Sequence, residues 1–373
     1  MTQTENHNTP QKPLIILTAG GTGGHVFPAE SLAEELLKRG YELALVTDAR
    51  GKNNYRGKLS EITNYSVCSG ALVGKSKLFK LKSLIKTCFG IIQAAFILLR
   101  KKPACVIGFG GYASFPCSMA AILLGIDLVI HEQNSVMSRT NRFLSKYASL
   151  IAQSFRNAKY TPHHIKSILT GMPIRRSISE LNGNPFPATT DGLKLLVIGG
   201  SQGAKIFSEI IPAAVKLLPS EIQNKLSITQ QCRECDIPSV ENQYKDTSCR
   251  LTVSHFFSNM PELYANSHLI ISRAGASSVF EIAAAGLPSI LVPLPTAADD
   301  HQTANTKYIT DFKGGIVITQ KEFTPEKLAQ TLTKLFNRPD ELAQMSLSIR
   351  RAAITNAAER FADAVEQEII ARR

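Results

Sequence analysis

A glycine-rich turn occurs twice in this chain of 373 residues, each time directly after a short apolar run. The first copy, Gly20–His25 (GGTGGH), follows Leu14–Leu17, and the second, Gly199–Ala204 (GGSQGA), follows Leu195–Ile198. An apolar run that ends in glycines and precedes a helical pattern is typical of the opening of a βαβ unit. Two such openings predict two α/β domains with a cleft between them.

The composition agrees with two folded domains and indicates which classes of partner the protein can bind. The length favours two domains over one, and 44% hydrophobic residues are enough to build their cores. A formal net charge of +12 predicts attraction to phosphates, nucleic acid or anionic lipid. Seven scattered cysteines predict a reducing compartment without a disulfide framework. The pair Cys232 and Cys235 lacks a second ligand pair, which favours incidental thiols in a loop over a metal or redox site.

Strand and helix patterns alternate along both halves, which predicts parallel sheets with right-handed crossovers. A polar tail is expected over 1–12, a linker over Gly171–Gly192, a first helix over Pro28–Arg39 and a last helix over Ile349–Arg373. The expected strands are Leu14–Thr18, Tyr41–Val46, Cys105–Ile107 and Leu128–Ile130 in the first half, then Lys194–Ile198, Ser227–Gln230, Leu269–Ser272 and Ser289–Val292. Ligands of such sheets bind beyond the carboxyl ends of the strands, where the polar motifs of this chain fall.

The first glycine turn ends in His25, although a phosphate cradle needs no histidine. In the first turn of a helix the dipole lowers the pKa of an imidazole, and a neutral imidazole at a strand end can act as a general base. The alternative is a tight turn with a capping histidine. In the second glycine-rich turn, Ser201 and Gln202 add neutral hydrogen-bonding groups that suit a diphosphate or a sugar.

Two polar segments follow later strands. In Arg273–Glu281, Ser277 or Ser278 can cap a helix, and Glu281 can accept hydrogen bonds from two ribose hydroxyls or serve as a capping-box acid. Arg273 itself suits either a phosphate or a surface ion pair. In Asp299–Asn305, Gln302 and Asn305 share a helical face that can meet sugar hydroxyls. The paired aspartates there have no third ligand at helical spacing, which disfavours a metal site.

The segment from Lys75 to Lys102 has lysines before an apolar run and three basic residues after it. One interpretation is a core helix with solvated ends. The other is an interfacial helix, whose lysines contact anionic head groups while its apolar side chains enter the acyl boundary. No apolar run reaches the ~20 residues that span a bilayer, so a transmembrane protein is not expected. Nucleic-acid binding is disfavoured, because the positive charge lacks interleaved aromatics.

These motifs together resemble the bacterial peptidoglycan N-acetylglucosaminyltransferases of glycosyltransferase family 28, over nearly the whole chain after the tail. The matching segments are Gly20–Pro28, Gly108–Tyr112, His131–Asn134, Gly199–Ala204, Arg273–Glu281 and Asp300–Gln302. The chain departs from the family pattern at Met172, where asparagine is usual, and at Arg233, where glycine is common.

The resemblance implies a GT-B fold, that is, an α/β protein with two Rossmann-like doubly wound parallel-sheet domains facing a cleft. It implies a flexible tail over 1–12, an acceptor- and membrane-facing domain over 13–172, a UDP-sugar-binding domain over 173–348, and a C-terminal helix over 349–373 that crosses back to the first domain.

The resemblance also implies the site residues. His25 is the expected catalytic base, with Glu132 as a second candidate. Phe257 lies where the family often has isoleucine against the uracil, Glu281 matches the ribose acid, and Gln302 matches a sugar-hydroxyl glutamine. The whole expected UDP-N-acetylglucosamine site is Thr22, Gly23, Gly24, Asn134, Arg175, Ser201, Phe257, Ala276, Ser277, Ser278, Val279, Phe280, Glu281 and Gln302.

The implied reaction is metal-free, cofactor-free, inverting transfer of N-acetylglucosamine from UDP-N-acetylglucosamine to lipid I, which forms lipid II for the cell wall and so serves cell shape and division. The implied partners are these two substrates, an anionic membrane surface at the cytoplasmic face of the cell membrane, where the protein is peripheral, and a cell-wall synthesis complex; nucleic acid is not among them. The alternative is a UDP-N-acetylglucosamine 2-epimerase, which shares the fold and the nucleotide but needs no lipid.

Overall fold

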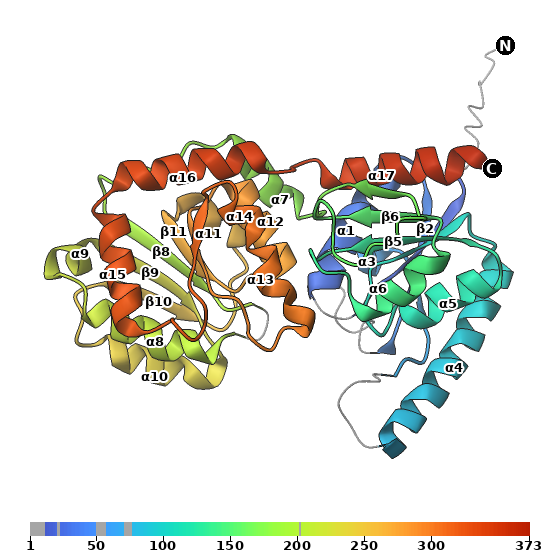
Figure 1. Cartoon of the computed structure of the whole chain (residues 1–373), viewed down its shortest axis with the longest axis horizontal. Coiled ribbons are helices and arrows are strands. Elements are labelled where there is room, and N and C mark those ends of the chain that lie inside the picture. The colour runs from blue at the N-terminus through green and yellow to red at the C-terminus, as the bar shows by residue number, and fades with distance from the viewer. Residues whose placement is uncertain (1–11, 21–22, 50–56, 71–76, 201–202) are drawn as a thin grey trace, which may run out of the picture. The chain divides into compact units, whose positions relative to one another are not determined.

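A computed structural model describes residues 12–20, 23–49, 57–70, 77–200 and 203–373. The chain forms two compact units, each with its own sheet (Figure 1). The first unit comprises residues 1–133, 137–173 and 357–373, and the second comprises 134–136 and 174–356. Both are α/β units with wholly parallel sheets, so the predicted fold class is confirmed.

The first unit is built on a seven-stranded sheet of order β3-β2-β1-β4-β5-β6-β7. The central strand β1 (Leu14–Thr18) pairs with β2 and β4 and is buried on both faces, as its continuous apolar sequence requires. The remaining strands are β2 (Glu42–Thr47), β3 (Thr63–Ser66), β4 (Cys105–Gly108), β5 (Asp127–Glu132), β6 (Leu150–Gln153) and β7 (Ser167–Leu169).

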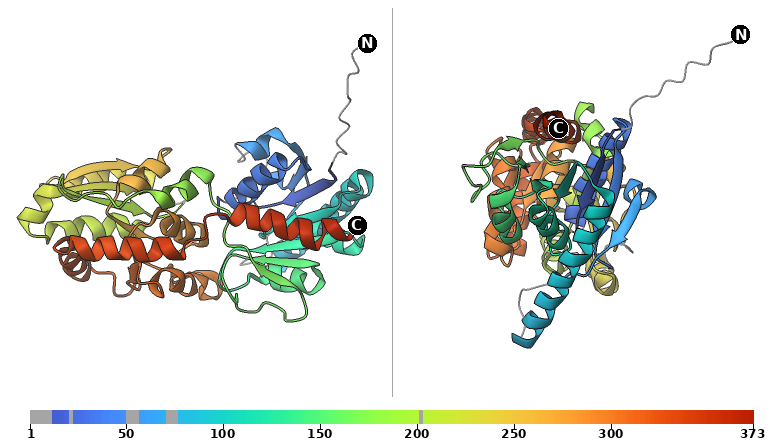
Figure 2. Two further views of the ribbon diagram at one scale, coloured as in Figure 1. Left: turned by 90° about the horizontal axis from the view of Figure 1, so that it is seen from above. Right: turned by 90° about the vertical axis from the view of Figure 1, so that its right-hand side faces the viewer.

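Helices cover both faces of this first sheet. Because side chains alternate along a strand, Ile15 and Leu17 pack with α1 and α17, whereas Ile16 packs with α4 and α5. Figure 2 shows α17, at the end of the chain, lying along this unit. The helical segments are α1 (Gly23–Lys38), α3 (Lys58–Glu61), α4 (Lys77–Lys101), α5 (Phe115–Leu123), α6 (Arg139–Leu144), η1 (Ser145–Tyr147), α17 (Ala357–Glu368) and η5 (Ile370–Arg372).

The second unit repeats the plan with six strands in the order β10-β9-β8-β11-β12-β13. Leu195 of the central strand is in register with Ile228 and Leu269, so apolar side chains meet across the sheet. The strands are β8 (Leu193–Ile198), β9 (Leu226–Gln231), β10 (Arg250–Ser254), β11 (Leu269–Ser272), β12 (Ser289–Leu291) and β13 (Gly315–Val317).

Short helices carry most of the polar motifs of the second unit. The helix α12 ends before Gly286, which adopts the left-handed conformation (φ 63°). Glycine adopts this conformation without a steric penalty and therefore commonly terminates helices. The helical segments are α7 (Arg176–Ser179), η2 (Glu180–Gly183), α8 (Lys205–Lys216), α9 (Ser220–Lys225), η3 (Glu234–Asp236), α10 (Ile237–Tyr244), α11 (Met260–Asn266), α12 (Ala276–Ala285), η4 (Ala298–Asp300), α13 (His301–Asn305), α14 (Lys307–Thr310), α15 (Pro325–Phe336) and α16 (Pro339–Ala352).

Several predicted segments differ from those in the structure. The first helix begins at Gly23 and not at Pro28, so Pro28 lies inside the helix, where its ring removes one backbone hydrogen bond. The expected linker over 171–192 contains α7 and η2. The single helix expected over 349–373 is two helices, since α16 ends at Ala352 and α17 begins at Ala357. The break lies where the chain passes from the second unit to the first.

Candidate active site

His25 lies in the first turn of α1, where the carboxyl end of β1 leads into the helix. Its Nδ1 is 2.7 Å from the carbonyl oxygen of Phe109, which follows β4. The Gln133 side chain donates to the same carbonyl at 3.1 Å. Since a carbonyl can only accept, Nδ1 must carry the proton, and the basic lone pair of the ring is then on Nε2. Nε2 has no hydrogen-bond partner among the residues that the structure describes.

The environment keeps this imidazole neutral. Burial lowers the pKa of His25 below its ordinary value of 6.5, and the Phe109 carbonyl raises it by a smaller amount. The predicted direction of the pKa shift is therefore confirmed, although desolvation is its main cause and not the helix dipole. A neutral ring with a basic Nε2 has the protonation state that a general base requires at pH 7.

Two glycines after β4 allow the backbone to pass close to this ring. Gly110 and Gly111 have φ values of 82° and 80°, which side-chain-bearing residues rarely adopt. A Cβ atom at Gly111 would lie 3.3 Å from His25 Nε2, so a larger residue would crowd the basic nitrogen. The Gly108–Tyr112 motif thus shapes the space beside His25.

Glu132, the second candidate base, is 1% exposed and lies within β5. Its Oε2 accepts hydrogen bonds from the Ser138 backbone at 3.0 Å and from the Asn141 side chain at 2.8 Å. These contacts fix the segment that precedes α6. The geometry therefore favours a structural role for Glu132 and leaves His25 as the better candidate base.

In the second unit, Glu281 forms a buried cluster with two partners. Its Oε1 accepts from Arg175 Nη2 at 3.1 Å and from Nε at 3.3 Å, and its Oε2 accepts from the Tyr264 hydroxyl at 3.2 Å. Burial raises the pKa of Glu281, while Arg175 and Tyr264 lower it. Tyr264, on α11, carries no motif in the sequence and was missed. Two of the predicted donor-binding residues, Arg175 and Glu281, are thus in direct contact.

The helix α12 presents its N-terminus beside this cluster. Val279 and Phe280 are buried, and the Phe280 ring packs on Tyr308 with centroids 4.4 Å apart. Their side chains belong to the core, so at these positions only the backbone is available for a ligand. Ser277 Oγ is buried without a hydrogen-bond partner in the described part of the chain. An orphaned hydroxyl next to the free N–H groups of a helix N-terminus suits a polar, anionic ligand.

Gln302 and Asn134 lie near this loop but are held differently. Gln302 Oε1 accepts from the Leu294 backbone at 3.0 Å, so its amide nitrogen is the group left to donate. Asn134 accepts at Oδ1 from Asn305 Nδ2 at 3.2 Å. Asn305 is fully buried, so the expectation that it meets a sugar hydroxyl was wrong.

Arg273 was expected to bind phosphate or form a surface ion pair, and the structure shows a third arrangement. Its Nη1 donates to the carbonyls of Val292 and Pro293, and its Nη2 donates to Gln320 Oε1 at 2.7 Å. The guanidinium also lies over the Phe207 ring, 5.2 Å from its centroid. Arg273 therefore ties together the loops that follow β11, β12 and β13.

The structure gives only the positions of the remaining predicted residues. Phe257 is partly buried in the loop between β10 and α11. Gly23 and Gly24 begin α1, and Ala276 and Ser278 lie in the first turn of α12. Thr22 and Ser201 lie outside the described residues. Within the described ranges no three His, Cys, Asp or Glu side chains gather as metal ligands would.

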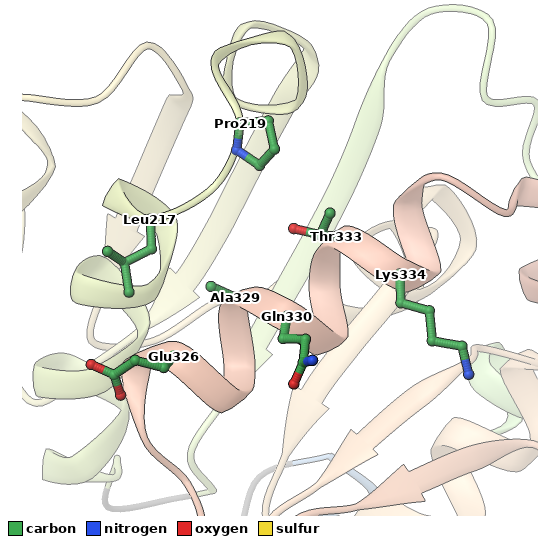
Figure 3. A pocket seen from close by; sticks show the side chains of 7 residues that line it. All are labelled: Leu217, Pro219, Glu326, Ala329, Gln330, Thr333 and Lys334. Carbon is green, nitrogen blue, oxygen red and sulfur yellow. The ribbon is translucent and has the colours of Figure 1, made fainter.

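An open groove elsewhere in the second unit does not contribute to this site. Figure 3 shows it between the end of α8 and the helix α15, with Leu217, Pro219 and Ala329 among its lining residues. The helix α8 returns the chain from the carboxyl end of β8 toward the amino end of β9. Its last residues therefore lie at the edge of the sheet opposite the carboxyl ends of the strands, where ligands of such sheets bind. The groove therefore does not adjoin the predicted donor-binding residues.

The helix α4 has many of its large apolar side chains on the outside. Small residues such as Thr87, Gly90 and Ala94 face the core. The exposed side chains, called here the α4 apolar face, are Leu81, Leu84, Ile85, Phe89, Ile92, Phe96 and Leu99, each at least 50% exposed. Contrary to expectation, Phe79–Lys101 is long and apolar enough to span a membrane by length and composition, which alone is weak evidence. Its packing on α5 makes it part of the first unit.

Comparisons with known proteins agree over nearly the full length. The glycosyltransferase family 28 N-terminal domain matches residues 15–153, and the family 28 C-terminal domain matches 194–367. The chain is 46% identical over 359 residues to the UDP-N-acetylglucosamine–N-acetylmuramyl-(pentapeptide) pyrophosphoryl-undecaprenol N-acetylglucosamine transferase of Paramagnetospirillum magneticum, which covers 95% of this chain and 96% of that one.

Solved structures are also similar to this chain over nearly its full length. The crystal structure of Acinetobacter baumannii MurG is similar with a TM-score of 0.76 and 33% identity, covering 95% of this chain and 99% of that one. A UDP-N-acetylglucosamine 2-epimerase structure has a TM-score of 0.67 at 13% identity, covering 97% and 98%, which is a likeness of fold alone.

Proposed function

The chain belongs to glycosyltransferase family 28, and we propose that it transfers N-acetylglucosamine from UDP-N-acetylglucosamine to undecaprenyl-pyrophosphoryl-N-acetylmuramoyl-pentapeptide, lipid I, to form lipid II in peptidoglycan synthesis. The observation that carries this proposal is 46% identity, over 95% of the chain, to a transferase named for that reaction. The distant likeness to the epimerase supports the fold and gives no reason to assign that activity.

The second unit is the proposed donor-binding unit. Glu281, held by Arg175 and Tyr264, is oriented to accept hydrogen bonds from the vicinal ribose hydroxyls. The Ser277 hydroxyl and the backbone N–H groups at the start of α12 donate to the nucleotide. Gln302, with its oxygen fixed by the Leu294 backbone, donates to a sugar hydroxyl. Glu281 and Gln302 are held by these contacts before the ligand arrives, which lowers the entropic cost of binding.

The first unit supplies the proposed base. The acceptor O4 hydroxyl attacks the anomeric carbon with inversion and gives its proton to His25 Nε2, while the bond from that carbon to the diphosphate oxygen breaks and UDP leaves with the electron pair. The negative charge that develops on UDP is met by fixed N–H groups and by the helix dipoles of α8 and α12, which need little reorganisation during the reaction.

A direct assay tests the proposed reaction. Radiolabelled UDP-N-acetylglucosamine is incubated with a lipid I analogue, with and without a chelator. We expect label in the lipid product, dependent on the acceptor and unchanged by the chelator. Release of free N-acetylmannosamine from the donor alone would instead indicate an epimerase.

The first unit also offers the proposed membrane surface. A polyprenyl-linked acceptor stays in the bilayer, so the enzyme must reach a membrane. The α4 apolar face is flanked by exposed lysines at Lys80, Lys82 and Lys86 and by basic residues at 100–102. Large apolar side chains bracketed by cations fit the interface of an anionic bilayer. We place the protein peripherally at the cytoplasmic face of the cell membrane, within reach of a cell-wall synthesis complex.

Reversing three charges tests this surface. Lys80→Glu, Lys82→Glu and Lys86→Glu together should release the protein from anionic vesicles, because each lysine near such a surface contributes about 1 kcal/mol. The measurement is co-sedimentation with liposomes. The matched control changes Lys225, Lys327 and Lys334 to glutamate, which alters net charge equally at exposed sites of the second unit. Equal sedimentation of both triple variants would remove α4 as the binding surface.

A further inference from the structure

Asn305 is the centre of a hydrogen-bonded cluster that joins three segments of the second unit. Its Nδ2 donates to the Ala274 carbonyl at 3.1 Å and to Asn134 Oδ1 at 3.2 Å. Its Oδ1 accepts from the Ser135 backbone N–H at 3.0 Å and from the Ser135 hydroxyl at 2.9 Å. An asparagine side chain has two donor hydrogens and two acceptor lone pairs, so these four bonds use its whole capacity.

Two backbone groups determine which way both amides face. The Ser135 N–H can only donate, so the Asn305 atom beside it must be the oxygen. The Ala274 carbonyl can only accept, so the atom beside it must be the nitrogen. That nitrogen donates to Asn134, and the Asn134 atom that receives the bond must therefore be Oδ1. The orientation of the Asn134 amide thus follows from backbone geometry through Asn305.

The same cluster links the Asn134 segment to residues 274–278, called here the nucleotide loop because they include three residues of the expected UDP-N-acetylglucosamine site. Ala274 directly precedes Gly275, the residue that caps α12, and α12 carries Ser277 and Glu281. Asn305 is fully buried, so solvent does not compete for its hydrogen bonds. A shift of the nucleotide loop would have to break a bond to Asn305 or carry residues 134–135 along with it.

We propose that Asn305 is a positioning residue for the donor sugar: it sets the amide of Asn134 in the orientation that recognises the sugar and holds it at a fixed place relative to the nucleotide loop. This inference rests on the proposed function and on the resemblance, which places Asn134 in the site for UDP-N-acetylglucosamine. Asn305 itself touches no ligand. It acts on the sugar half of the donor and not on the uridine half.

The isosteric variant Asn305→Asp tests the inference. The carboxylate keeps an oxygen for Ser135 but places a second oxygen against the Ala274 carbonyl and Asn134 Oδ1, so the Asn134 amide must turn over. We expect the Kd for UDP-N-acetylglucosamine, measured by titration calorimetry, to rise roughly 10- to 100-fold, while the Kd for UDP changes by less than about threefold. Lys307→Ala, an exposed change on the neighbouring helix, is the control and should alter neither.

A double-mutant cycle separates positioning from a general structural role. If Asn305 acts through Asn134, Asn305→Asp should add little to the loss already caused by Asn134→Ala. Equal losses for UDP and UDP-N-acetylglucosamine, or additive losses in the double variant, would overturn the inference. UDP binding also reports that the variant unit is folded. If the unchanged protein fails to bind UDP-N-acetylglucosamine, the proposed function itself is wrong; if it binds and Asn305→Asp binds equally well, only the inference is.

Discussion

His25→Ala is expected to lower kcat for N-acetylglucosamine transfer by about 10²- to 10⁴-fold while leaving the Kd for UDP nearly unchanged. The side chain removed carries the basic Nε2, and its Nδ1 proton is committed to the Phe109 carbonyl. The residues proposed to bind uridine lie in the second unit, whereas His25 belongs to the first. Turnover with a lipid I analogue and UDP binding by calorimetry are the two measurements.

The pH profile of the unchanged enzyme gives an independent check. Because burial lowers the pKa of His25 below 6.5, the ring is neutral at pH 7 and becomes protonated only when the pH falls through that lowered value. We expect kcat/KM to stay level down to pH values below 6.5 and then to fall, and the fall assigned to this group should be missing in His25→Ala. His164→Ala, at an exposed position of the same unit, is the control. Near-normal turnover of His25→Ala would exclude His25 as the base.

The central strands could be predicted from the sequence because burial on both faces requires continuous apolar runs. Leu14–Thr18 and Leu269–Ser272 were predicted with the boundaries that the structure shows. The outer strand β3 (Thr63–Ser66) could not be found this way, because an edge strand that is half exposed carries polar residues and lacks the signal. The end of β5 was placed too early, since Glu132 is buried through hydrogen bonds and not through hydrophobicity.

The sequence predicted where some candidate site residues lie in the secondary structure, whereas their tertiary contacts could not be predicted. His25 could be placed in the first helical turn because glycine turns and helix starts are local features. Its partner, the Phe109 carbonyl, is 84 residues away, and Arg175 is 106 residues from Glu281. Tyr264 lies in an ordinary amphipathic helix, and nothing in its neighbourhood marks it as a partner of a carboxylate. The roles of such residues can be identified only from the tertiary structure, because the fold brings distant segments together.

Glu281→Leu is expected to weaken UDP binding roughly 100-fold and to lower the free energy of unfolding by about 3 kcal/mol. The binding loss is expected because leucine cannot make the proposed charged hydrogen bonds to the ribose. The stability loss follows because Arg175, whose side chain is 32% exposed, would keep its charge without this carboxylate. The Tyr264 hydroxyl would also lose its acceptor in a buried position. Calorimetry with UDP and urea unfolding measure the two effects.

The double variant Arg175→Leu, Glu281→Leu distinguishes the two consequences of losing Glu281. Removing both charges of a largely buried ion pair is often neutral or stabilising, so most of the lost unfolding free energy should return. UDP affinity should not return, because no acceptor for the ribose hydroxyls is restored. If the double variant instead binds UDP as well as the unchanged protein, Glu281 and Arg175 serve only to hold α7 against α12, and the ribose contact must be sought elsewhere in the second unit.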